Sequence, residues 1–356
     1  MDIDLYTTTS CNLRCIYCYQ GRHTPEQEAL YRRMKAFDKP ISLDDAEEAV
    51  IQLCSPGDFV CFTGGEPLVN PDWMLAVMQR VEKYRVRFGL FTNGTLIHRT
   101  PVDLLRRLDQ VQISLDGPAD IHNQYRGPDV YEKALEGRRL LEQVWEDYPH
   151  HSDLEPLVWA RMTVPPTADL FYNLSGLAED YDHIYWQFQN GPDLDPMDVK
   201  ARVEQTNRVI DLWLERLRTD DRLWLAPLET TIDAIRKGGV DKGPDNIGCG
   251  CKAGWYFISV FSDGNYYDCP EQIMQSYARL GSIKDGLTTI HNVPDVPQAQ
   301  HCLKCPEWEI CGTRCLYYSG GDYCRVLLPY YRRMREVEPT ISDVHIEQPP
   351  NFEAVF

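Results

Sequence analysis

The chain opens with MDIDLYTTTSCNLRCIYCYQ, residues 1–20, and this stretch decides how the rest is interpreted. Its first part, DIDLYTTT (2–9), is rich in β-branched and aromatic residues and is typical of a strand. A loop with the spacing CxxxCxxC follows, formed by Cys11, Cys15 and Cys18. Three thiolates this close can each bind one iron of a four-iron, four-sulfur cluster, and no fourth cysteine stands nearby. One iron is therefore left open, as in sites that act on a substrate.

The segments after this loop predict an α/β fold. Strand-like runs are expected at 58–63, 87–92, 110–116, 156–164 and 183–189. Helices are expected to start at Ser42, Asn70-Pro71, Thr100-Pro101 and Asp129. Six strand–helix units up to about residue 236 predict a parallel sheet with right-handed crossovers, a partial (β/α)6 TIM-like barrel. Ligands bind such barrels at the C-terminal ends of the strands.

Composition limits the classes of function. The chain has 356 residues, with 36 basic and 54 acidic side chains and a net charge of −18. That charge argues against binding phosphate backbones or anionic lipid, so no nucleic acid and no membrane is expected as a partner. The sequence has no signal peptide and no run of about 18 apolar residues, which predicts a soluble, cytoplasmic protein. In a reducing cytoplasm its 13 cysteines are interpreted as metal ligands or catalytic groups.

Two motifs at strand ends strengthen the interpretation of the first loop. Thr63-Gly64-Gly65-Glu66-Pro67 follows the second expected strand, and Thr92-Asn93-Gly94-Thr95 follows the third. Together with CxxxCxxC after the first strand, this order resembles the radical S-adenosylmethionine (SAM) superfamily. The resemblance implies that the GGEP segment, Gly64 to Pro67, binds the amino group of SAM and that Asn93 helps to shape the barrel mouth. A zinc site with a distant fourth ligand is the alternative for the cysteine loop.

The fourth expected strand supplies further SAM contacts. Gln112, Ser114 and Asp116 alternate along it, so they share one face, which is expected to point into the barrel. The resemblance implies that Ser114, Asp116 and the following Arg126 hold the ribose and carboxylate of SAM. Further candidates are His122 as a polar contact and Arg161, Thr163, Gln187 and Gln189 as residues lining the cavity, with barrel packing as the alternative.

The resemblance also implies the reaction and its supply of electrons. An electron from the cluster cleaves SAM to methionine and a 5′-deoxyadenosyl radical, which abstracts hydrogen from an unactivated carbon. An external electron donor of the flavodoxin or ferredoxin type is expected as a partner.

Eight of the thirteen cysteines lie between residues 249 and 324. The composition changes at Gly238, which predicts a barrel over 1–237, a cysteine-rich domain over 238–335 and a tail over 336–356. The spacing resembles the SPASM domain of peptide-modifying radical SAM enzymes, which holds two auxiliary four-iron clusters. The resemblance implies one cluster on Cys249, Cys251, Cys269 and Cys315, and a second on Cys302, Cys305, Cys311 and Cys324.

Several alternatives remain open in this region. Cys249 is either a cluster ligand or a spare thiol that leaves one iron open, and a pair of zinc sites would use the same cysteine pattern. The dipeptide Asp263-Gly264 predicts a hairpin between the two sets. Cys54 and Cys61 are expected to be core residues.

The expected function is maturation of a ribosomally made peptide by cross-linking, epimerisation or oxidation. The runner-up is an anaerobic sulfatase maturase, which oxidises serine or cysteine to formylglycine. Relatives of that kind carry an aspartate directly after the cysteine equivalent to Cys269, whereas this chain has Pro270, so Asp268 and Glu271 are the candidate catalytic bases. A small-molecule dehydrogenase or epimerase and a non-catalytic iron–sulfur or zinc protein are further alternatives. Only ten residues precede Cys11, so recognition of a leader peptide is expected to use the barrel, the tail or a separate protein.

Overall fold

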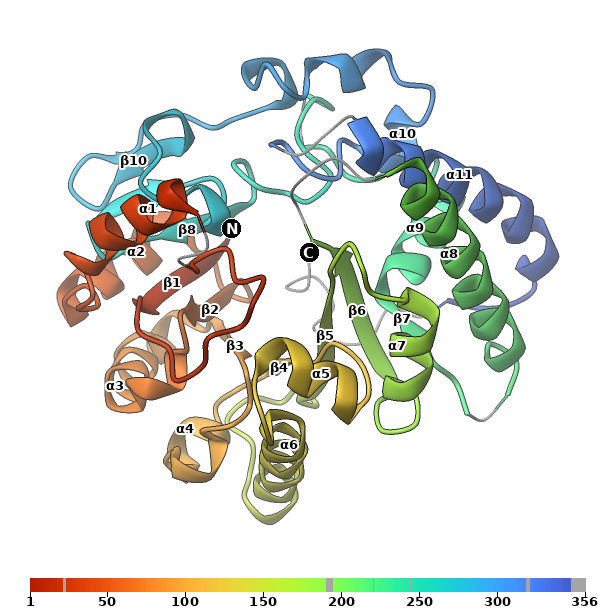
Figure 1. Ribbon diagram of the computed structural model, residues 1–356. Coiled ribbons are helices and arrows are strands. Elements are labelled where there is room, and N and C mark those ends of the chain that lie inside the picture. The colour runs from red at the N-terminus through yellow and green to blue at the C-terminus, as the bar shows by residue number, and fades with distance from the viewer. Residues whose placement is uncertain (22–23, 190–194, 220, 244, 318–320, 347–356) are drawn as a thin grey trace.

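The computed structural model describes residues 1–21, 24–189, 195–219, 221–243, 245–317 and 321–346. These residues form one sheet of eleven strands, in the order β11-β10-β9-β8-β1-β2-β3-β4-β5-β6-β7 (Figure 1). All neighbours from β1 to β7 are parallel, as the sequence predicts. Within the described ranges, no helix is long and apolar enough to cross a membrane.

The parallel strands confirm the predicted order and add one strand. They are β1 (Asp2–Thr8), β2 (Phe59–Gly64), β3 (Arg87–Thr92), β4 (Gln110–Ser114), β5 (Leu157–Val164), β6 (His183–Phe188) and β7 (Trp224–Leu225). The prediction of a strand over 110–116 is two residues too long, because β4 ends at Ser114. Six strand–helix units were predicted, and the structure adds a seventh parallel strand, β7. Its two residues are too few to show an alternating pattern in the sequence.

The helices follow the strands with readable starts. They are α1 (Pro25–Lys35), α2 (Leu43–Leu53), α3 (Pro71–Val81), α4 (Val102–Leu105), α5 (Ala119–Arg126), α6 (Val130–Asp147), α7 (Leu170–Leu177), α8 (Pro196–Arg216) and α9 (Ala226–Lys237). The Ser42 hydroxyl accepts the Asp45 N–H, which confirms this residue as the N-cap of α2. Helix α1 was not predicted, although Thr24 and Gln27 form a capping box at its start. Short 3-10 helices cover Pro67–Val69, Glu82–Tyr84, Ile97–Arg99, Pro270–Gln272, Ser276–Ala278, Val293–Asp295, Gln300–Lys304 and Glu338–Ile341.

The cysteine-rich part extends the barrel sheet. Its strand β8 (Phe257–Val260) pairs parallel with β1, and β9 (Asn265–Tyr267) returns antiparallel beside β8. The predicted turn is confirmed, with Gly264 at φ +78° between the two strands. The strands β10 (Arg279–Ser282) and β11 (Gly286–Leu287) complete this edge.

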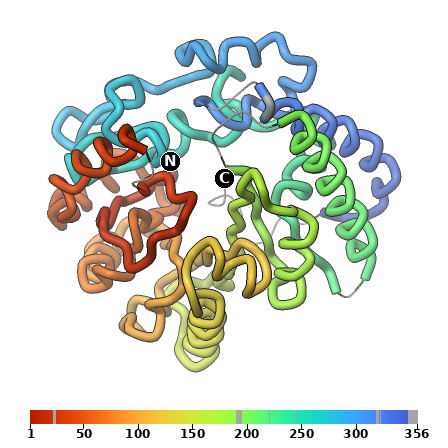
Figure 2. The backbone as a smooth tube through the Cα atoms, in the orientation of Figure 1, coloured from red at the N-terminus to blue at the C-terminus, as the bar shows by residue number. Residues whose placement is uncertain are grey.

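The same part of the chain also reaches the opposite side of the barrel. There α11 (Gly321–Val337) packs against α8 and α9, and the short α10 (Trp308–Cys311) also contacts α9. Figure 2 shows the cyan segment beside the N-terminal strand and the blue helix beside the green helices. The expected tail over 336–356 therefore begins in helix. Residues 347–356 lie outside the described residues, and the domain limits stay a prediction.

Side chains alternate between two environments along the strands. Ile3, Leu5, Val60 and Phe62 are fully buried in the main hydrophobic cluster between sheet and helices. Cys61 points to the other face, where its Sγ lies 2.6 Å from the position of a Cβ added to Gly89. A larger residue at position 89 would therefore require this thiol to move. Cys61 is a core residue as predicted, whereas Cys54 is half-buried at the end of α2.

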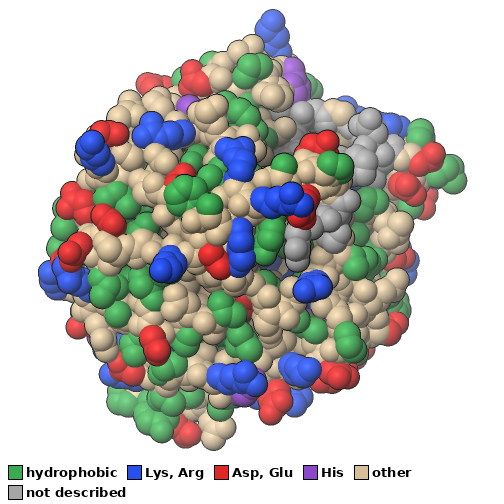
Figure 3. Space-filling model, turned by 60° about the vertical axis from the view of Figure 1, so that its left-hand side comes forward, with side chains coloured by type: hydrophobic (Ala, Val, Ile, Leu, Met, Phe, Trp, Pro, Cys, Tyr) green, Lys and Arg blue, Asp and Glu red, His purple; other side chains and the backbone are tan. Residues whose placement is uncertain are grey.

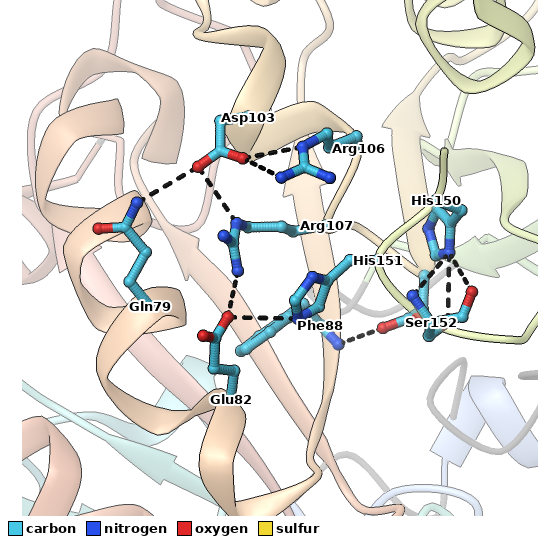
Figure 4. Close-up of polar contacts among 10 residues, drawn as sticks. Gln79, Glu82, Phe88, Asp103, Arg106, Arg107, His150, His151 and Ser152 are labelled. Carbon is cyan, nitrogen blue, oxygen red and sulfur yellow. Dashed lines mark hydrogen bonds and ion pairs between the residues drawn. The ribbon is translucent and has the colours of Figure 1, made fainter. Parts of the chain in front are cut away.

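Charged side chains of both signs are interspersed on the surface, as Figure 3 shows for one face. Figure 4 shows a polar network at the N-terminal ends of β3 and β4, where Asp103 contacts both Arg106 and Arg107. Deeper in this region, Asp109 is 2% exposed and accepts the Phe88 N–H at 2.7 Å. Exposed ion pairs contribute little to stability, whereas a buried acceptor that satisfies a backbone N–H contributes more.

We expect Asp109→Ala to lower the free energy of unfolding by about 2 kcal/mol, because it leaves the buried Phe88 N–H without its acceptor. The matched control Asp103→Ala should change it by less than about 0.5 kcal/mol, since that carboxylate is partly exposed. Urea unfolding of the two variants measures both values. Equal losses would show that burial of Asp109 does not decide the stability of this end of the barrel.

Candidate functional site

The cysteine loop leaves the C-terminal end of β1 and is anchored before its first cysteine. Asp38 accepts hydrogen bonds from the Thr9 N–H at 3.0 Å and from the Ser10 hydroxyl at 3.0 Å, and Lys35 forms an ion pair with it. Hydrogen bonds from Lys35, Thr9 and Ser10 hold the pKa of this carboxyl well below its usual range, against the effect of burial. The loop therefore starts from a fixed point.

The three thiols of the loop are free and lie close together. Burial, with smaller contributions from Glu66, Cys15 and Cys18, raises the pKa of Cys11 to about 12 against a backbone hydrogen bond. A set of three thiols without disulfides fits a cluster that takes one sulfur for each of three irons. The loop therefore brings together the donors that the sequence pattern predicts.

The two glycines of the GGEP segment allow β2 to approach the residues before the cysteine loop. A Cβ at Gly64 would lie 2.3 Å from the Thr8 carbonyl oxygen, and a Cβ at Gly65 would lie 2.3 Å from that of Ser10. The Gly65 N–H donates to the Thr8 carbonyl at 2.8 Å. Close backbone contact of this kind requires glycine. These glycines therefore fix where the cysteine loop begins.

Glu66 lies inside the protein and joins the GGEP and TNGT segments. Its side chain is 1% exposed and accepts hydrogen bonds from the Leu68 N–H, the Thr92 hydroxyl and the Asn93 N–H at 2.8–3.1 Å. Burial raises the pKa of Glu66 to about 6, against these three hydrogen bonds. The Glu66 carboxylate therefore accepts hydrogen bonds from three groups of this chain and joins the two segments.

The TNGT segment in turn holds the cysteine loop. The Asn93 amide donates to the Asn12 side chain at 2.9 Å, and the Asn12 amide donates to the Thr95 hydroxyl at 2.8 Å. Asn12 is the residue after Cys11, so the loop is clamped at its first cysteine. Three motifs that are far apart in the sequence thus form one hydrogen-bonded unit at the C-terminal ends of β1, β2 and β3.

Asp116 and Arg126 form a buried ion pair on the other side of the cysteine loop. Arg126 binds Asp116 with two N–H groups at 2.6 and 3.0 Å, and Asp116 is fully buried. The Tyr17 hydroxyl also donates to this carboxylate, and the Thr163 N–H lies 3.2 Å from it. Burial raises the pKa of the Cys15 thiol, and the positive charge of Arg126 opposes this rise. Arg126 is therefore held beside the second cysteine of the loop.

Two other predicted contacts lie next to this pair. Ser114 ends β4 and is half-buried, and His122 is fully buried in α5. The His122 Nδ1 accepts the Asp116 N–H at 3.2 Å, which leaves the proton on Nε2. Burial lowers the pKa of His122 to about 3, so the ring is neutral. His122 supports the backbone at Asp116.

The inward face of the barrel carries a polar layer around Arg161. This guanidinium donates to Gln112 at 2.8 Å and to Gln187 at 3.0 Å, and lies 4.6 Å from the ring centre of Tyr185. Asp4 is buried nearby, where burial raises its pKa and Arg161 opposes the rise. The structure thus connects Arg161 and Gln187, two of the predicted lining residues, whereas Thr163 contributes its backbone to Asp116.

A cavity of about 430 Å³ opens beside the cysteine loop. Its lining includes Asn12, Ile16, Tyr125, Arg126 and Lys133. The Ile16 side chain is 55% exposed at its rim, and the Ile16 N–H is bound to the Tyr125 carbonyl oxygen at 3.0 Å. The loop is therefore supported from α5 and open on this side.

The first predicted auxiliary set is gathered beside the barrel. The sulfur atoms of Cys249 and Cys251 lie 3.1 Å apart. Burial raises the pKa of Cys249, and the neighbouring Cys251 and Cys315 add to the rise. Burial also raises the pKa of Cys269, with smaller effects from Glu271, Cys315 and Cys251. None of these four cysteines forms a disulfide. Cys249 thus lies beside Cys251 and near Cys315.

The second predicted set is spread over three elements. Cys302 lies in the 3-10 helix Gln300–Lys304, Cys305 directly follows it, and Cys311 ends α10. Cys302 is near enough to Cys311 to raise the pKa of that thiol, after the larger effect of burial. Cys324 lies in α11. Within the described ranges, no three His, Cys, Asp or Glu side chains converge on a point for a single metal ion.

The two predicted bases differ in their surroundings. Asp268 is fully buried, lies 2.7 Å from the His291 Nδ1 and accepts the Tyr317 hydroxyl, while its Oδ1 has no hydrogen-bond partner. Glu271 is half-buried and lies near Cys269 and near Tyr19, which follows Cys18. Glu271 therefore lies close to both cysteine regions.

Sequence reasoning missed the residues that position the predicted ones. Tyr17 and Asp38 are examples, and the role of Asp38 becomes visible only in three dimensions. The aromatic residue before Cys18 was a possible signal, because it sits inside the motif. His291 and Tyr317 showed no such signal in the sequence, because both are distant in sequence from Asp268, which they contact.

Comparison with known proteins gives matches over almost the whole chain. Residues 5–151 match the model of the Radical SAM superfamily. The chain is 32% identical over 303 residues to a cysteine-type anaerobic sulfatase-maturating enzyme of Clostridium novyi, covering 78% of this chain and 75% of that one.

Two solved structures show the same fold. Native anSMEcpe with bound AdoMet has a TM-score of 0.68 at 18% identity, covering 96% of this chain and 100% of that one. SuiB of Streptococcus suis bound to its precursor peptide SuiA has a TM-score of 0.58 at 14% identity, covering 88% and 71%.

We expect Glu66→Gln to lower the free energy of unfolding by about 2 kcal/mol, because the amide presents a donor where two backbone N–H groups and a hydroxyl need acceptors. The exposed Glu48→Gln on α2 is the matched control and should change it by less than about 0.5 kcal/mol. Denaturant unfolding under one set of conditions measures both. An unchanged stability for Glu66→Gln would contradict its role in joining the two segments.

Proposed function

The chain belongs to the radical SAM superfamily and is an enzyme, and we propose that it modifies a residue of a peptide or protein substrate. The observation that carries this proposal is the position of Glu271, which interacts with both Tyr19 and Cys269. The segment after Cys269 therefore lies near the end of the first cysteine loop. A substrate residue held there would be reached from both sides.

The donor sets fit the cofactors that the superfamily implies. Cys11, Cys15 and Cys18 would hold the cluster that binds SAM. When bound and reduced, this cluster with SAM supplies a 5′-deoxyadenosyl radical that abstracts a hydrogen atom from the substrate. We infer that an external donor of the flavodoxin or ferredoxin type provides the electron, and that the predicted cytoplasmic location applies.

The chain's own residues would orient SAM. Gly64, Gly65 and Pro67 shape the backbone near the amino group, with Glu66 and Asn93 holding that backbone in place. Arg126 uses its Nε and Nη2 groups on Asp116, which leaves other N–H groups for the SAM carboxylate. Ser114, half-buried at the end of β4, would contact the ribose.

We propose two auxiliary clusters in the cysteine-rich part. One would be bound by Cys249, Cys251, Cys269 and Cys315, a proposal supported by the mutual effects on their pKa values. The other would be bound by Cys302, Cys305, Cys311 and Cys324. Inclusion of Cys249 is supported by its sulfur lying 3.1 Å from that of Cys251.

Glu271 fits a catalytic role at the substrate better than Asp268 does. The Asp268 carboxylate contacts the His291 ring and accepts a hydrogen bond from the Tyr317 hydroxyl, so it stabilises the segment before Cys269. Glu271 is partly exposed and lies near enough to Tyr19 to influence the pKa of that phenol. We therefore assign the base to Glu271 and a supporting role to Asp268.

Formylglycine formation is the second candidate. It is supported by the 32% identity to a sulfatase-maturating enzyme over three quarters of the length of that relative. Pro270 occupies the position after Cys269 where relatives of that kind carry aspartate. If Glu271 replaces that aspartate, the same oxidation of cysteine or serine becomes possible.

Protein reconstituted without oxygen should contain about twelve irons per chain, four for each of three clusters. Reduction in the presence of SAM should release 5′-deoxyadenosine. Cys15→Ala should remove about four irons and abolish SAM cleavage, whereas Cys54→Ala should change neither, because Cys54 lies outside all three sets. Iron analysis and chromatography of the nucleoside measure these outcomes.

Different results would overturn different parts of the proposal. Bound zinc in place of iron, with no SAM cleavage, would contradict the radical reaction. About four irons with normal SAM cleavage would leave the radical reaction in place and refute the auxiliary clusters. Loss of cleavage in Cys54→Ala would show that the control disturbs the fold.

Glu271→Gln should lower the rate of substrate modification by about 100-fold, the usual effect of removing a general base. Cleavage of SAM without substrate should persist in this variant. Asp268→Asn is the comparison variant and should chiefly lower stability. Mass spectrometry should follow a cysteine-containing sulfatase peptide and short peptides encoded beside this gene. Equal modification rates for Glu271→Gln and the unaltered enzyme would show that Glu271 is not the general base.

A further inference from the structure

The cavity of about 430 Å³ beside the first cysteine loop, here called the loop cavity, is lined by three short stretches of the chain. One is the loop itself between residues 12 and 16, and another is Thr95 of the TNGT segment. The third covers residues 124–133, from the last turn of α5 to the first turn of α6. Figure 1 shows the loop that follows β1 next to α5. Among the described residues, none from the cysteine-rich part lines this cavity.

The loop cavity is distinct from the proposed SAM site. Of the residues assigned to SAM, only Arg126 lines it. The Nε and Nη2 groups of Arg126 donate to Asp116. The GGEP segment, Asn93 and Ser114 are not part of the lining. Binding of SAM therefore does not explain the loop cavity.

Positive charge gathers at the loop cavity, although the whole chain carries a net charge of −18. Its lining contains three cations, Arg14, Arg126 and Lys133, and no acidic residue. Arg14 and Lys133 are exposed. Neither of these two forms an ion pair with a side chain in the part of the chain that the structure describes. Exposed, unpaired cations around a concave surface attract a partner with acidic groups.

Acidic side chains flank the loop cavity without lining it. Asp129 and Glu132 belong to the same stretch of chain as Lys133, but neither is part of the lining. The Glu132 carboxylate accepts a hydrogen bond from the Asn123 amide at 3.2 Å. The cations at the cavity are therefore not neutralised from within its lining.

The loop cavity also offers apolar surface. The Ile16 side chain is 55% exposed, and Leu13, Pro128 and Val130 line the cavity with it. Apolar surface rimmed by charged groups is typical of a site that binds another protein. Transient electron-transfer complexes need only a small surface of this kind, below about 1,200 Å² in total.

The lining of this cavity includes the residues that flank the proposed cluster ligands. Arg14 and Ile16 are the neighbours of Cys15, and the Leu13 N–H donates to the Cys11 Sγ at 3.3 Å. A protein seated here would contact the loop that holds the cluster, and electron transfer requires that two redox centres approach closely. The other end of the loop, at Tyr19, lies near Glu271, where the substrate is proposed to react. The donor and the substrate would therefore use different parts of the loop.

We propose that the loop cavity is the docking surface for the electron donor, a small acidic electron-transfer protein whose carboxylates contact Arg14 and Lys133. The proposal rests on the proposed function, because reductive cleavage of SAM creates the need for such a donor. One electron leaves the donor and enters the cluster of the loop for each SAM cleaved. Charge pairs at the rim of such a complex chiefly speed association, and salt weakens them.

Calorimetric titration without oxygen tests the docking surface directly. The full-length, iron-loaded protein is titrated with an acidic flavodoxin in its oxidised form, which delivers no electron, so the result is independent of SAM cleavage. Arg14→Gln and Lys133→Gln should each weaken binding about 3-fold, and the variant with both changes about 10-fold. Lys284→Gln removes an exposed positive charge between β10 and β11 and should bind like the unaltered protein. High salt should weaken binding of the unaltered protein more than binding of the variant with both changes.

Two reductants separate docking from the reaction. With limiting reduced flavodoxin, the variant with both changes should release 5′-deoxyadenosine about 10-fold more slowly. With dithionite, a small reductant that needs no docking surface, the rate should equal that of the unaltered enzyme. Iron analysis of each variant separates lost docking from a lost cluster, and Lys133→Gln on α6 remains informative if Arg14→Gln loses iron.

Three results would overturn the docking surface. The first is no flavodoxin binding, or equal affinity of the unaltered protein and the variant with both changes. The second is an equal loss in Lys284→Gln, which would show that total charge and not this surface decides binding. The third comes from titration with inorganic phosphate. If Arg14→Gln and Lys133→Gln lose phosphate binding and keep flavodoxin binding, the cavity takes a small anion instead.

Failure of the proposed function has a different signature. If flavodoxin binds through Arg14 and Lys133 and supports SAM cleavage, but no peptide is modified, the peptide substrate is wrong and the docking surface stands. If peptides are modified and the variants bind flavodoxin normally, the function stands and the docking surface is wrong.

Discussion

Pairing on both sides of β1 determines where the functional parts of this protein lie. Ile3 pairs with Val60 of β2 on one side and with Ile258 of β8 on the other, and both neighbours run parallel to β1. The C-terminal end of β1 leads directly into the first cysteine loop. Parallel neighbours end at the same edge of a sheet, so β2 delivers the GGEP segment there, and β8 ends there in the turn at Gly264 before β9 runs back toward Cys269. One strand thus sets the position of the cysteine loop relative to the auxiliary cysteines.

Buried charge near the site divides into two kinds. Glu66 and Asp116 are buried and have several donors from the chain, so the cost of removing them from water is offset within the fold. They hold backbone segments and the Arg126 side chain in fixed positions. Arg202 and Arg314 are different, because no described acidic side chain forms an ion pair with either. A charge satisfied by the chain, such as Glu66 or Asp116, holds the structure around it in place.

The sequence predicted the parts of the fold that have strong local patterns. The strand at 87–92 has the limits of β3, and Ser42 caps α2 as its position predicts. The short β7 was missed because two residues show no period, and α4 is only four residues long where a longer helix was expected. Pairing of β8 with β1 was not predictable, because nothing local specifies which distant strand extends a sheet edge. Local sequence patterns therefore predicted individual strands and helices, whereas the pairing of distant strands could not be predicted from them.

The same distinction explains what could be inferred about the site. Cysteine spacing predicts ligand sets because short loops hold neighbouring thiols together, as the 3.1 Å between the sulfur atoms of Cys249 and Cys251 shows. Spacing does not reveal the partners of a carboxylate, since Asp268 contacts His291 and Tyr317, which are distant from it in sequence. An arginine in an amphipathic helix, such as Arg202, reads as a surface residue until α11 covers it. Because α11 contains Cys324 and packs against α8, the segment that would bind a cluster also packs beside the helix that carries Arg202. The auxiliary sites therefore depend on the packing of the C-terminal part against α8 and α9.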